Sequence, residues 1–203
     1  MSFQNVFWDS CVFSAYLMDE QAAYDIPSIE SFLEDAKQGR LKIYASTISS
    51  AEVLPSQMKA AASFEDFMAD FEGAIVPIEP NPNVMTLSGR FRDLPYRKGT
   101  STNRRLSTPD AIMLATAVHL VEGYSVQLDC IHTFDGGGKK DLDGNRSIPL
   151  LGYETWCEGF SPEQLALANK IIQIERCKPV YPAPELPLVM PGDPPAAAAP
   201  AAE

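Results

Sequence analysis

Short apolar runs alternate with longer stretches of helical character along most of this chain of 203 residues. The runs with strand character lie at about 4–9, 41–45, 74–78, 128–134 and 147–151. The stretches with helical spacing lie at about 11–18, 27–38, 48–60, 64–71, 81–93 and 109–121. Strands separated by helices indicate βαβ crossovers. The pattern therefore predicts an α/β fold, a three-layer α/β/α sandwich with a mainly parallel central sheet of about five strands.

The size and composition of the chain agree with one such domain followed by an appendage. The residues are 45% hydrophobic, which is enough to bury a substantial core. We expect the domain over residues 1–158 and a C-terminal helix over 159–177, which Ser161-Pro162-Glu163 would start. Residues 178–203 are rich in Pro and Ala, a composition that does not build a packed core. We expect a flexible, extended tail there.

Two of the predicted strands end at an acidic residue. Asp9 follows Val6-Phe7-Trp8, and Asp135 follows Cys130-Ile131-His132-Thr133-Phe134. In open parallel sheets the ligand crevice lies outside the carboxyl ends of the strands, where loops collect functional side chains. We therefore expect Asp9 and Asp135 to face one site.

Two more acids lie near the starts of predicted helices. Glu52 lies one to two turns into the helix expected at 48–60. Asp110 lies in the first turn of the next candidate, where Thr108 would be the N-cap and Pro109 the first helical residue. An acid in that turn also stabilises a helix through the macrodipole, by about 0.3–1 kcal/mol, which is an alternative explanation of Asp110. Taken by itself, Glu52 is typical of a solvated helix residue. Taken by itself, Asp135 is typical of an acid in a turn before glycines.

A gathering of these four acids would favour a hard divalent cation. Carboxylate oxygens without a His or Cys cluster beside them suit Mg²⁺ or Mn²⁺. Such an ion would relieve the repulsion among the carboxylates, lower the pKa of a bound water and orient it for attack on a phosphodiester. His119 and His132, the two histidines, are too few for a zinc site, and we expect them to pack or hydrogen-bond locally.

Four sequence blocks, over roughly residues 3 to 150, occur in the order found in one family. They are Val6-Phe7-Trp8-Asp9-Ser10-Cys11-Val12-Phe13-Ser14-Ala15-Tyr16-Leu17, Ser49-Ser50-Ala51-Glu52-Val53-Leu54, Leu106-Ser107-Thr108-Pro109-Asp110-Ala111-Ile112-Met113-Leu114-Ala115-Thr116-Ala117 and His132-Thr133-Phe134-Asp135. With these blocks the chain resembles a PIN-domain nuclease, of the kind that includes the VapC toxins of bacterial toxin–antitoxin pairs. The resemblance does not extend beyond about Gly159.

The resemblance implies a Mg²⁺- or Mn²⁺-dependent endoribonuclease that leaves a 5′-phosphate and a 3′-hydroxyl. It implies that all four acids are catalytic, with Asp9 and Asp110 as direct metal ligands and Glu52 and Asp135 acting through water or a second ion. Ser10 and Thr133 are similar to the family's hydroxyl residues that hold a carboxylate or water in place. RNA is the implied substrate, and a small antitoxin or a second copy of the chain is the implied protein partner. The extra C-terminal segment departs from a typical VapC, and it leaves a solitary nuclease without an antitoxin as the alternative.

The charge of the chain gives two opposing indications about nucleic acid. The formal net charge of -11 argues against tight, nonspecific coating of DNA. Six of the 16 Lys and Arg residues nevertheless lie just before Asp110, at Arg90, Arg92, Arg97, Lys98, Arg104 and Arg105. Arg104 and Arg105 are candidates for binding the substrate backbone on either side of the cut, and a solvated loop with ordinary surface charge is the alternative.

Two other classes of function compete with a nuclease. One is a catalytically silent PIN-like module that binds RNA or protein, which the presence of all four acids disfavours. The other is a phosphatase with Asp9 as nucleophile, which would want a second Asp two residues on, where Cys11 stands. The cysteines show no CxxC spacing, and no apolar run is long enough to span a membrane, so we expect a cytoplasmic protein with reduced thiols.

Overall fold

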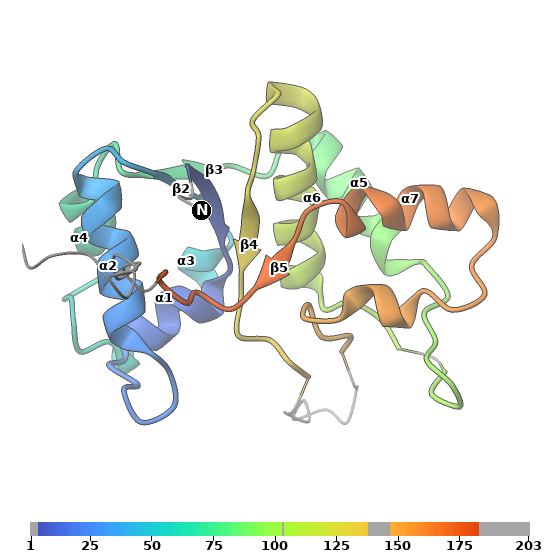
Figure 1. The fold of residues 1–203 in the computed structure, drawn as a ribbon, viewed down its shortest axis with the longest axis horizontal. Helices are drawn as coiled ribbons and strands as arrows, with labels where there is room; N and C mark the ends of the chain where they lie inside the picture. Colours follow the sequence, from blue (N-terminus) through green and yellow to red (C-terminus); the bar gives the residue numbers. More distant parts are fainter. Residues whose placement is uncertain (1–3, 103, 138–146, 183–203) are drawn as a thin grey trace, which may run out of the picture.

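The computed structural model describes residues 4–102, 104–137 and 147–182, and these residues form an α/β domain around a five-stranded sheet (Figure 1). The strands are β1 (Asn5–Trp8), β2 (Lys42–Ser46), β3 (Ile75–Ile78), β4 (Cys130–His132) and β5 (Arg176–Cys177). They follow the order β3-β2-β1-β4-β5, and every neighbouring pair is parallel. The α/β fold class with a parallel sheet is therefore confirmed.

Helices cover both faces of this sheet within the described part of the chain. They are α1 (Ser10–Leu17), α2 (Ile26–Lys37), α3 (Ser49–Glu52), α4 (Phe64–Asp70), α5 (Pro82–Arg92), α6 (Thr108–Tyr124) and α7 (Pro162–Ile172). The first four lie on one side and the last three on the other, which gives the three layers (Figure 1). None of the helices described is long and apolar enough to cross a membrane.

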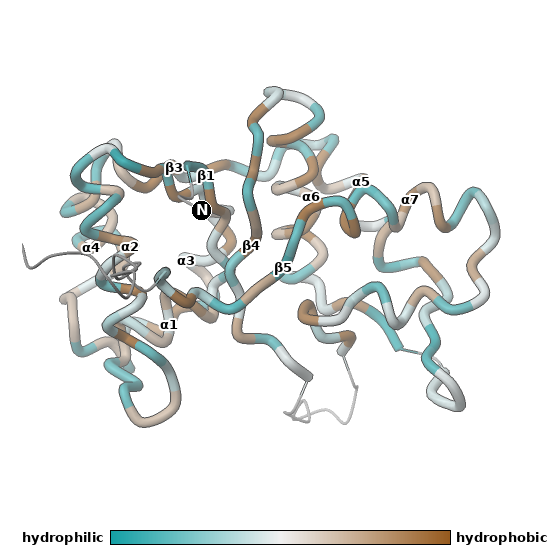
Figure 2. The backbone as a smooth tube through the Cα atoms, viewed as in Figure 1, coloured by the Kyte–Doolittle hydropathy of each residue, from teal (hydrophilic) through white to brown (hydrophobic). Residues whose placement is uncertain are grey.

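The central strand β1 is apolar because it is covered on both faces. Side chains alternate along a strand, so Val6 and Trp8 pack in the cluster with α1, α2 and α4, while Phe7 packs in the cluster with α6. The side chains of all three are fully buried. Figure 2 shows hydrophobic residues where α6 meets the sheet. Strand β1 is thus the fixed centre from which the following loop takes its position.

The order of the strands creates one special edge in the sheet. From β1 the chain first adds β2 and β3 on one side, and it later returns to add β4 and β5 on the other. The crossovers therefore diverge between β1 and β4, and open α/β sheets bind ligands in the crevice at such a switch point. Asp9 follows β1 directly, and Asp135 lies three residues beyond β4.

The prediction of a strand at 147–151 is wrong. Pro149 has no N–H to donate to a ladder, and the N–H groups of Leu150 and Leu151 bond to the side chain and the backbone of Asp135 instead. Ser147 forms only an isolated bridge with Arg105.

Three helix boundaries also differ from expectation. Arg176 and Cys177 supply the fifth strand, so the helix expected to reach residue 177 ends at Ile172. Pro55 shortens the helix expected at 48–60 to α3 and a 3₁₀ turn over Pro55–Gln57. The N-cap of α6 is Ser107, and Thr108 is already the first helical residue.

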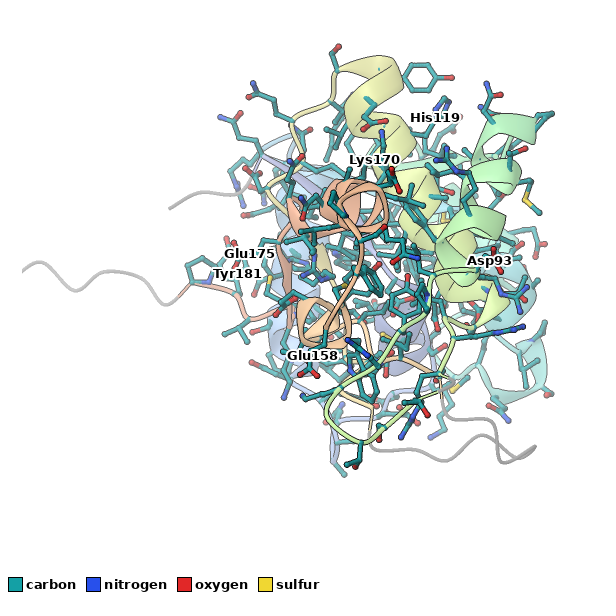
Figure 3. The ribbon with its side chains drawn as sticks, turned by 90° about the vertical axis from the view of Figure 1, so that its right-hand side faces the viewer. Asp93, His119, Glu158, Lys170, Glu175 and Tyr181 are labelled. Atoms are coloured by element: carbon teal, nitrogen blue, oxygen red, sulfur yellow. The ribbon has the colours of Figure 1, made fainter. Side chains whose placement is uncertain are left out.

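Beyond β5 the chain crosses α2 before the described residues end at 182. The backbone N–H of Tyr181 donates to Ser28 Oγ at 3.0 Å, and its hydroxyl donates to Asp35 Oδ2 at 2.6 Å. Its ring packs edge-on against Phe32. Figure 3 shows Tyr181 and Glu175 on the opposite side of the molecule from Asp93, at the end of α5. Most of the expected tail, residues 183–203, lies outside the described residues.

Candidate functional site

A pocket of about 650 Å³ opens at the switch point of the sheet. Three of the four acids singled out in the sequence, Glu52, Asp110 and Asp135, line it. The fourth, Asp9, is only 4% exposed, and its charge raises the pKa of both Asp110 and Glu52. Residues far apart in the chain are therefore brought together as the sequence predicts.

Asp9 is held from inside the protein by donors from two elements. It occupies the N-cap position of α1, but its side chain caps no helical N–H. Its Oδ2 instead accepts hydrogen bonds from Thr133 Oγ1 at 2.7 Å and Cys11 Sγ at 2.9 Å. Its Oδ1 accepts only a long bond of 3.4 Å from Ser10. The hydrogen bonds to Oδ2 thus fix the orientation of the carboxylate, and Oδ1 keeps most of its capacity to accept further bonds.

Asp110 has a strongly perturbed carboxyl group. Burial, together with the negative charges of Asp9, Asp135 and Glu52, raises its pKa from 3.8 to about 7, against a lowering hydrogen bond with Ser107. A helix N-terminus by itself stabilises a carboxylate and would lower this pKa. The pKa of Asp110 moves in the opposite direction because of burial and the neighbouring acids, so a helix-stabilising charge alone does not explain Asp110.

Glu52, at the end of α3, responds to the same surroundings. Burial raises its pKa, and the charge of Asp9 adds to the effect, while a hydrogen bond with Ser10 opposes it. Ser10 therefore contacts two of the acids, as expected for a residue that holds carboxylates in place.

Asp135 also organises the loop that it begins. Its Oδ1 accepts from Gly137 N–H at 3.1 Å, and its Oδ2 accepts from Leu150 N–H at 3.0 Å. Gly137 has φ 78°, and a Cβ there would lie 2.9 Å from the Pro149 ring, so the loop requires glycine at this position. Thr133 Oγ1 accepts the backbone N–H of Asp135 at 3.0 Å while donating to Asp9. Thr133 thus links the loops after β1 and β4.

The two arginines expected to bind substrate lie beside the pocket and do not line it. Arg104 Nη1 donates to the carbonyl of Ser147, a lining residue, at 3.4 Å, and its guanidinium lies 5.1 Å from the Trp156 ring centroid. The Arg105 carbonyl accepts from Ile148 N–H, and its side chain is exposed. Arg97 is committed to the carbonyl of Glu158. The basic stretch is therefore partly structural, and Arg104 is a member whose guanidinium contacts a residue of the pocket lining.

Four contributors to the site are missing from the sequence-based prediction. Cys11 touches Asp9, Ser107 accepts the N–H of Asp110, and Tyr24 and Phe134 form an aromatic wall with ring centroids 4.2 Å apart. Burial and the charge of Asp9 raise the pKa of the Cys11 thiol, so it stays a neutral donor. The Ser107-x-x-Asp110 spacing was a usable signal, since a side-chain cap reaches the backbone three residues on. No feature of the sequence around Tyr24 indicates that it belongs to the site.

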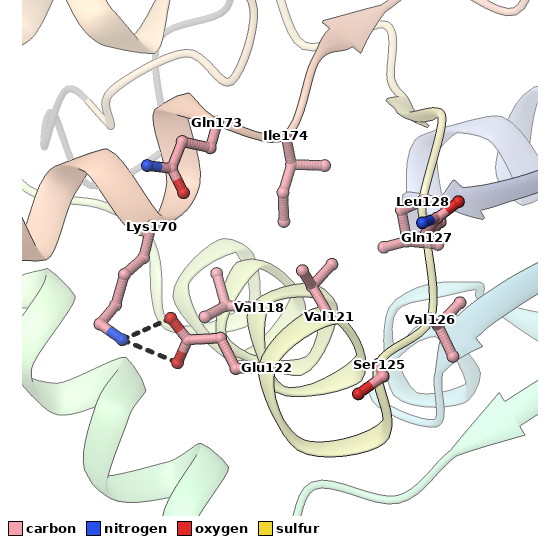
Figure 4. Close-up of a pocket in the computed structure, with 10 residues that line it drawn as sticks. All are labelled: Val118, Val121, Glu122, Ser125, Val126, Gln127, Leu128, Lys170, Gln173 and Ile174. Carbon is pink, nitrogen blue, oxygen red and sulfur yellow. Dashed lines mark hydrogen bonds and ion pairs between the residues drawn. The ribbon is translucent and has the colours of Figure 1, made fainter.

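A smaller pocket of about 320 Å³ lies between α6 and α7 and differs in kind (Figure 4). Its acid, Glu122, pairs with Lys170, whose Nζ lies 2.7 Å from Oε2. Its other lining residues are mainly apolar or uncharged. This pocket lacks the convergent charges that make the larger one a candidate site.

The pKa of Asp110 predicts a stability that falls as pH rises in metal-free protein. Between pH 4 and pH 7 the folded state keeps a proton on this carboxyl that the unfolded state releases, so folding is favoured at the acidic end of that window. One pKa unit corresponds to about 1.4 kcal/mol, so we expect Asp110→Asn to gain about 2 kcal/mol over wild type between pH 5 and pH 8. Urea unfolding in chelator at both pH values measures this, and an equal pH dependence for the two proteins would contradict it.

No protein-family model matches the chain, and no curated protein matches it. The geometry and chemistry of the pocket are therefore the ground for a functional assignment.

Proposed function

We propose that the protein is a metal-dependent endoribonuclease of the PIN type. The observation that carries this proposal is the gathering of acids at one pocket, where burial, together with the charges of Asp9, Asp135 and Glu52, raises the pKa of Asp110 to about 7. A divalent cation would stabilise carboxylates that lie so close together, and their oxygen atoms are ligands that suit Mg²⁺ or Mn²⁺. A bound ion of this kind would lower the pKa of a water and neutralise charge on a phosphodiester.

The roles of the acids follow from how each is held. Asp9 would bind the ion through Oδ1, because Thr133 and Cys11 occupy Oδ2. Asp110 would be the second direct ligand, since its raised pKa marks it as the group with most to gain from a cation. Glu52 and Asp135 would complete the site through water or a second ion. A nucleophilic Asp9, as in a phosphatase, is disfavoured because Cys11 stands where that chemistry would want a second Asp.

Features of the pocket rim support RNA with unpaired bases as the substrate. Tyr24 and Phe134 offer aromatic surface on the wall, and stacking on such rings is how proteins hold single-stranded nucleic acid without reading its sequence. Arg104 contacts Ser147 at the pocket rim, and from there it would bind a backbone phosphate of the RNA. The net charge of -11 is compatible with this local grip, and it disfavours nonspecific coating.

The surroundings of such an enzyme follow from its chemistry. The four cysteines are free, which suits a reducing cytoplasm. A small antitoxin could control the enzyme by placing a basic side chain among the acids, and a homodimer is the other assembly to test. A solitary nuclease requires neither.

Incubation of labelled single-stranded RNA with wild type and with Asp110→Asn, purified in parallel, tests the proposal. We expect Mn²⁺-dependent cleavage by wild type, abolished by chelator, with 5′-phosphate and 3′-hydroxyl ends. The variant should lose roughly 100-fold or more of the rate, because it lacks one of the two proposed anionic ligands. Equal cleavage by both proteins would assign the activity to a contaminant. Metal-dependent RNA binding without any cleavage would favour the silent module instead.

A further inference from the structure

A cluster of two thiols and an imidazole lies where β4 meets β5. The donor atoms of Cys130, His132 and Cys177 all lie within 4.8 Å of one another. His132 and Cys177 are paired in register, and Cys130 lies two residues earlier on the same face of β4. Both cysteines are free. None of the three residues lines the acidic pocket, so the cluster is a separate place in the fold.

The surroundings of this cluster are apolar and largely closed to solvent. Cys130 and His132 are fully buried, whereas Cys177 is half-buried and packs against the same hydrophobic core. The ring of Phe32 packs against that of His132, with centroids 4.6 Å apart. Magnesium and manganese prefer oxygen ligands, and magnesium keeps several waters, whereas sulfur ligands select soft ions such as copper(I) and zinc. The cluster therefore suits a soft ion.

The orientation of His132 excludes its ring as a metal ligand. The indole Nε1–H of Trp8 donates to His132 Nδ1 at 3.0 Å, so Nδ1 is an acceptor and a neutral ring carries its proton on Nε2. An ion at Nε2 would move that proton to Nδ1, where it would face the Trp8 N–H. Metal-binding imidazoles give their second N–H to an acceptor, and an indole offers none. The two sulfurs are therefore the ligands that the cluster can supply.

Two thiolates suit copper(I) better than zinc. Structural and catalytic zinc sites take three or four protein ligands in tetrahedral geometry. Copper(I) favours thiolates, and two of them in a near-linear arrangement satisfy it. Metal–thiolate bonds are about 2.3 Å long, so an ion midway between two sulfurs needs them about 4.6 Å apart, or closer where the arrangement is bent. The sulfurs of Cys130 and Cys177 lie within 4.8 Å of each other, which accommodates such an ion.

We propose that Cys130 and Cys177 bind one copper(I) ion through their Sγ atoms, as a bridge between β4 and β5. Each thiol loses its proton to solvent, so one Cu⁺ and two thiols give a singly negative bis-thiolate complex and two protons, with no change of oxidation state. His132, whose ring lies in the same cluster, would stabilise that charge by donating a hydrogen bond from Nε2. The proposal is independent of the nuclease activity.

A bound ion would reinforce a short junction in the sheet. Strand β5 has only two residues. Its junction with β4 includes the bonds from Ile131 N–H to the carbonyl of Glu175 at 2.7 Å and from Thr133 N–H to the carbonyl of Cys177 at 2.9 Å. A ligand that binds the folded state and not the unfolded state stabilises the folded state. We therefore expect copper(I) to slow hydrogen exchange at the N–H of Thr133.

Anaerobic transfer of copper(I) from its coloured bicinchoninate complex to the full-length protein tests the proposal. Wild type should remove one equivalent of copper per chain, which lowers the absorbance of the chelator complex. Cys130→Ser and Cys177→Ser should each bind copper(I) about 100-fold more weakly or worse, because a hydroxyl is a hard ligand. Cys157→Ser is the matched control, since Cys157 is also free and half-buried but lies outside the cluster. Its affinity should stay within about twofold of wild type.

X-ray absorption at the copper edge of the loaded protein should show two sulfur ligands and no nitrogen ligand. If Cys130→Ser loses the native circular dichroism spectrum, the half-buried Cys177→Ser carries the test. Failure of wild type to take copper from the chelator would overturn the proposal, as would equal uptake by wild type and Cys177→Ser. A nitrogen ligand would overturn the two-sulfur site in favour of one that includes His132. Binding of zinc without any uptake of copper(I) would overturn the choice of ion.

Discussion

Asp9→Asn is expected to lower metal-dependent RNA cleavage by at least about 100-fold while the protein stays folded. The reason lies in the two hydrogen bonds that Thr133 and Cys11 donate to Oδ2. An asparagine must direct its carbonyl oxygen to those donors, so its NH₂ group takes the place of Oδ1. The variant thereby replaces the proposed metal-binding oxygen with a group that cannot bind a cation. Single-turnover cleavage with saturating Mn²⁺ measures the loss.

Asp129→Asn is the matched control for this variant. Asp129 lies just before β4, at the other end of the sheet, where its Oδ2 accepts the N–H groups of Gln4 and Asn5. An amide oxygen can accept the same bonds, so activity within about twofold of wild type is expected. If Asp9→Asn cleaved RNA at a rate within about threefold of wild type, Asp9 would be excluded as a metal ligand.

Phe13→Ala should destabilise the protein strongly, with a loss of about 3–5 kcal/mol of unfolding free energy. Phe13 is fully buried in α1, and its ring meets those of Trp8, Phe64 and Phe67 at centroid distances of 5.3, 5.5 and 5.9 Å. Removal of the ring leaves a cavity shared by the sheet, α1 and α4. Because α1 begins directly after Asp9, the variant should also weaken cleavage.

Urea unfolding of Phe13→Ala and Tyr124→Ala tests this expectation. Tyr124 is 65% exposed at the end of α6, so its loss should change stability by no more than about 0.5 kcal/mol. A cost below about 1 kcal/mol for Phe13→Ala would show that the aromatic cluster repacks around the missing ring.

The parts of the fold that local pattern determines could be predicted from sequence. Strands β1, β2 and β3 lie within a residue or two of their expected positions because each is a short, mainly apolar run followed by a helix. The segment 147–151 shows why others fail. Ile148 and Leu150 are fully buried and alternate as in a strand, but the backbone between them bonds to Asp135. Strand β5 has only two residues, and its pairing with β4 leaves no local signal.

The candidate site likewise has parts that could be predicted from the sequence and parts that could not. The convergence of Asp9, Glu52, Asp110 and Asp135 could be predicted because the carboxyl ends of parallel strands share one edge. The contacts of Cys11 and Tyr24 could not, since they depend on side-chain packing between distant segments. Cys130 and His132 have the spacing of one strand face, but their partner Cys177 comes from a strand that the sequence does not reveal.

The chain order of the sheet also determines when the pocket can exist during synthesis. Asp9 and Glu52 belong to the first half of the sheet, whereas Thr133 and Asp135 follow β4, which pairs with β1 only after about two thirds of the chain has been made. A ribosome adds roughly 5–20 residues per second, so several seconds separate the first acid from the last. The nascent protein therefore lacks an assembled acidic pocket until β4 and the residues after it have left the ribosome, and any activity of that pocket begins only then.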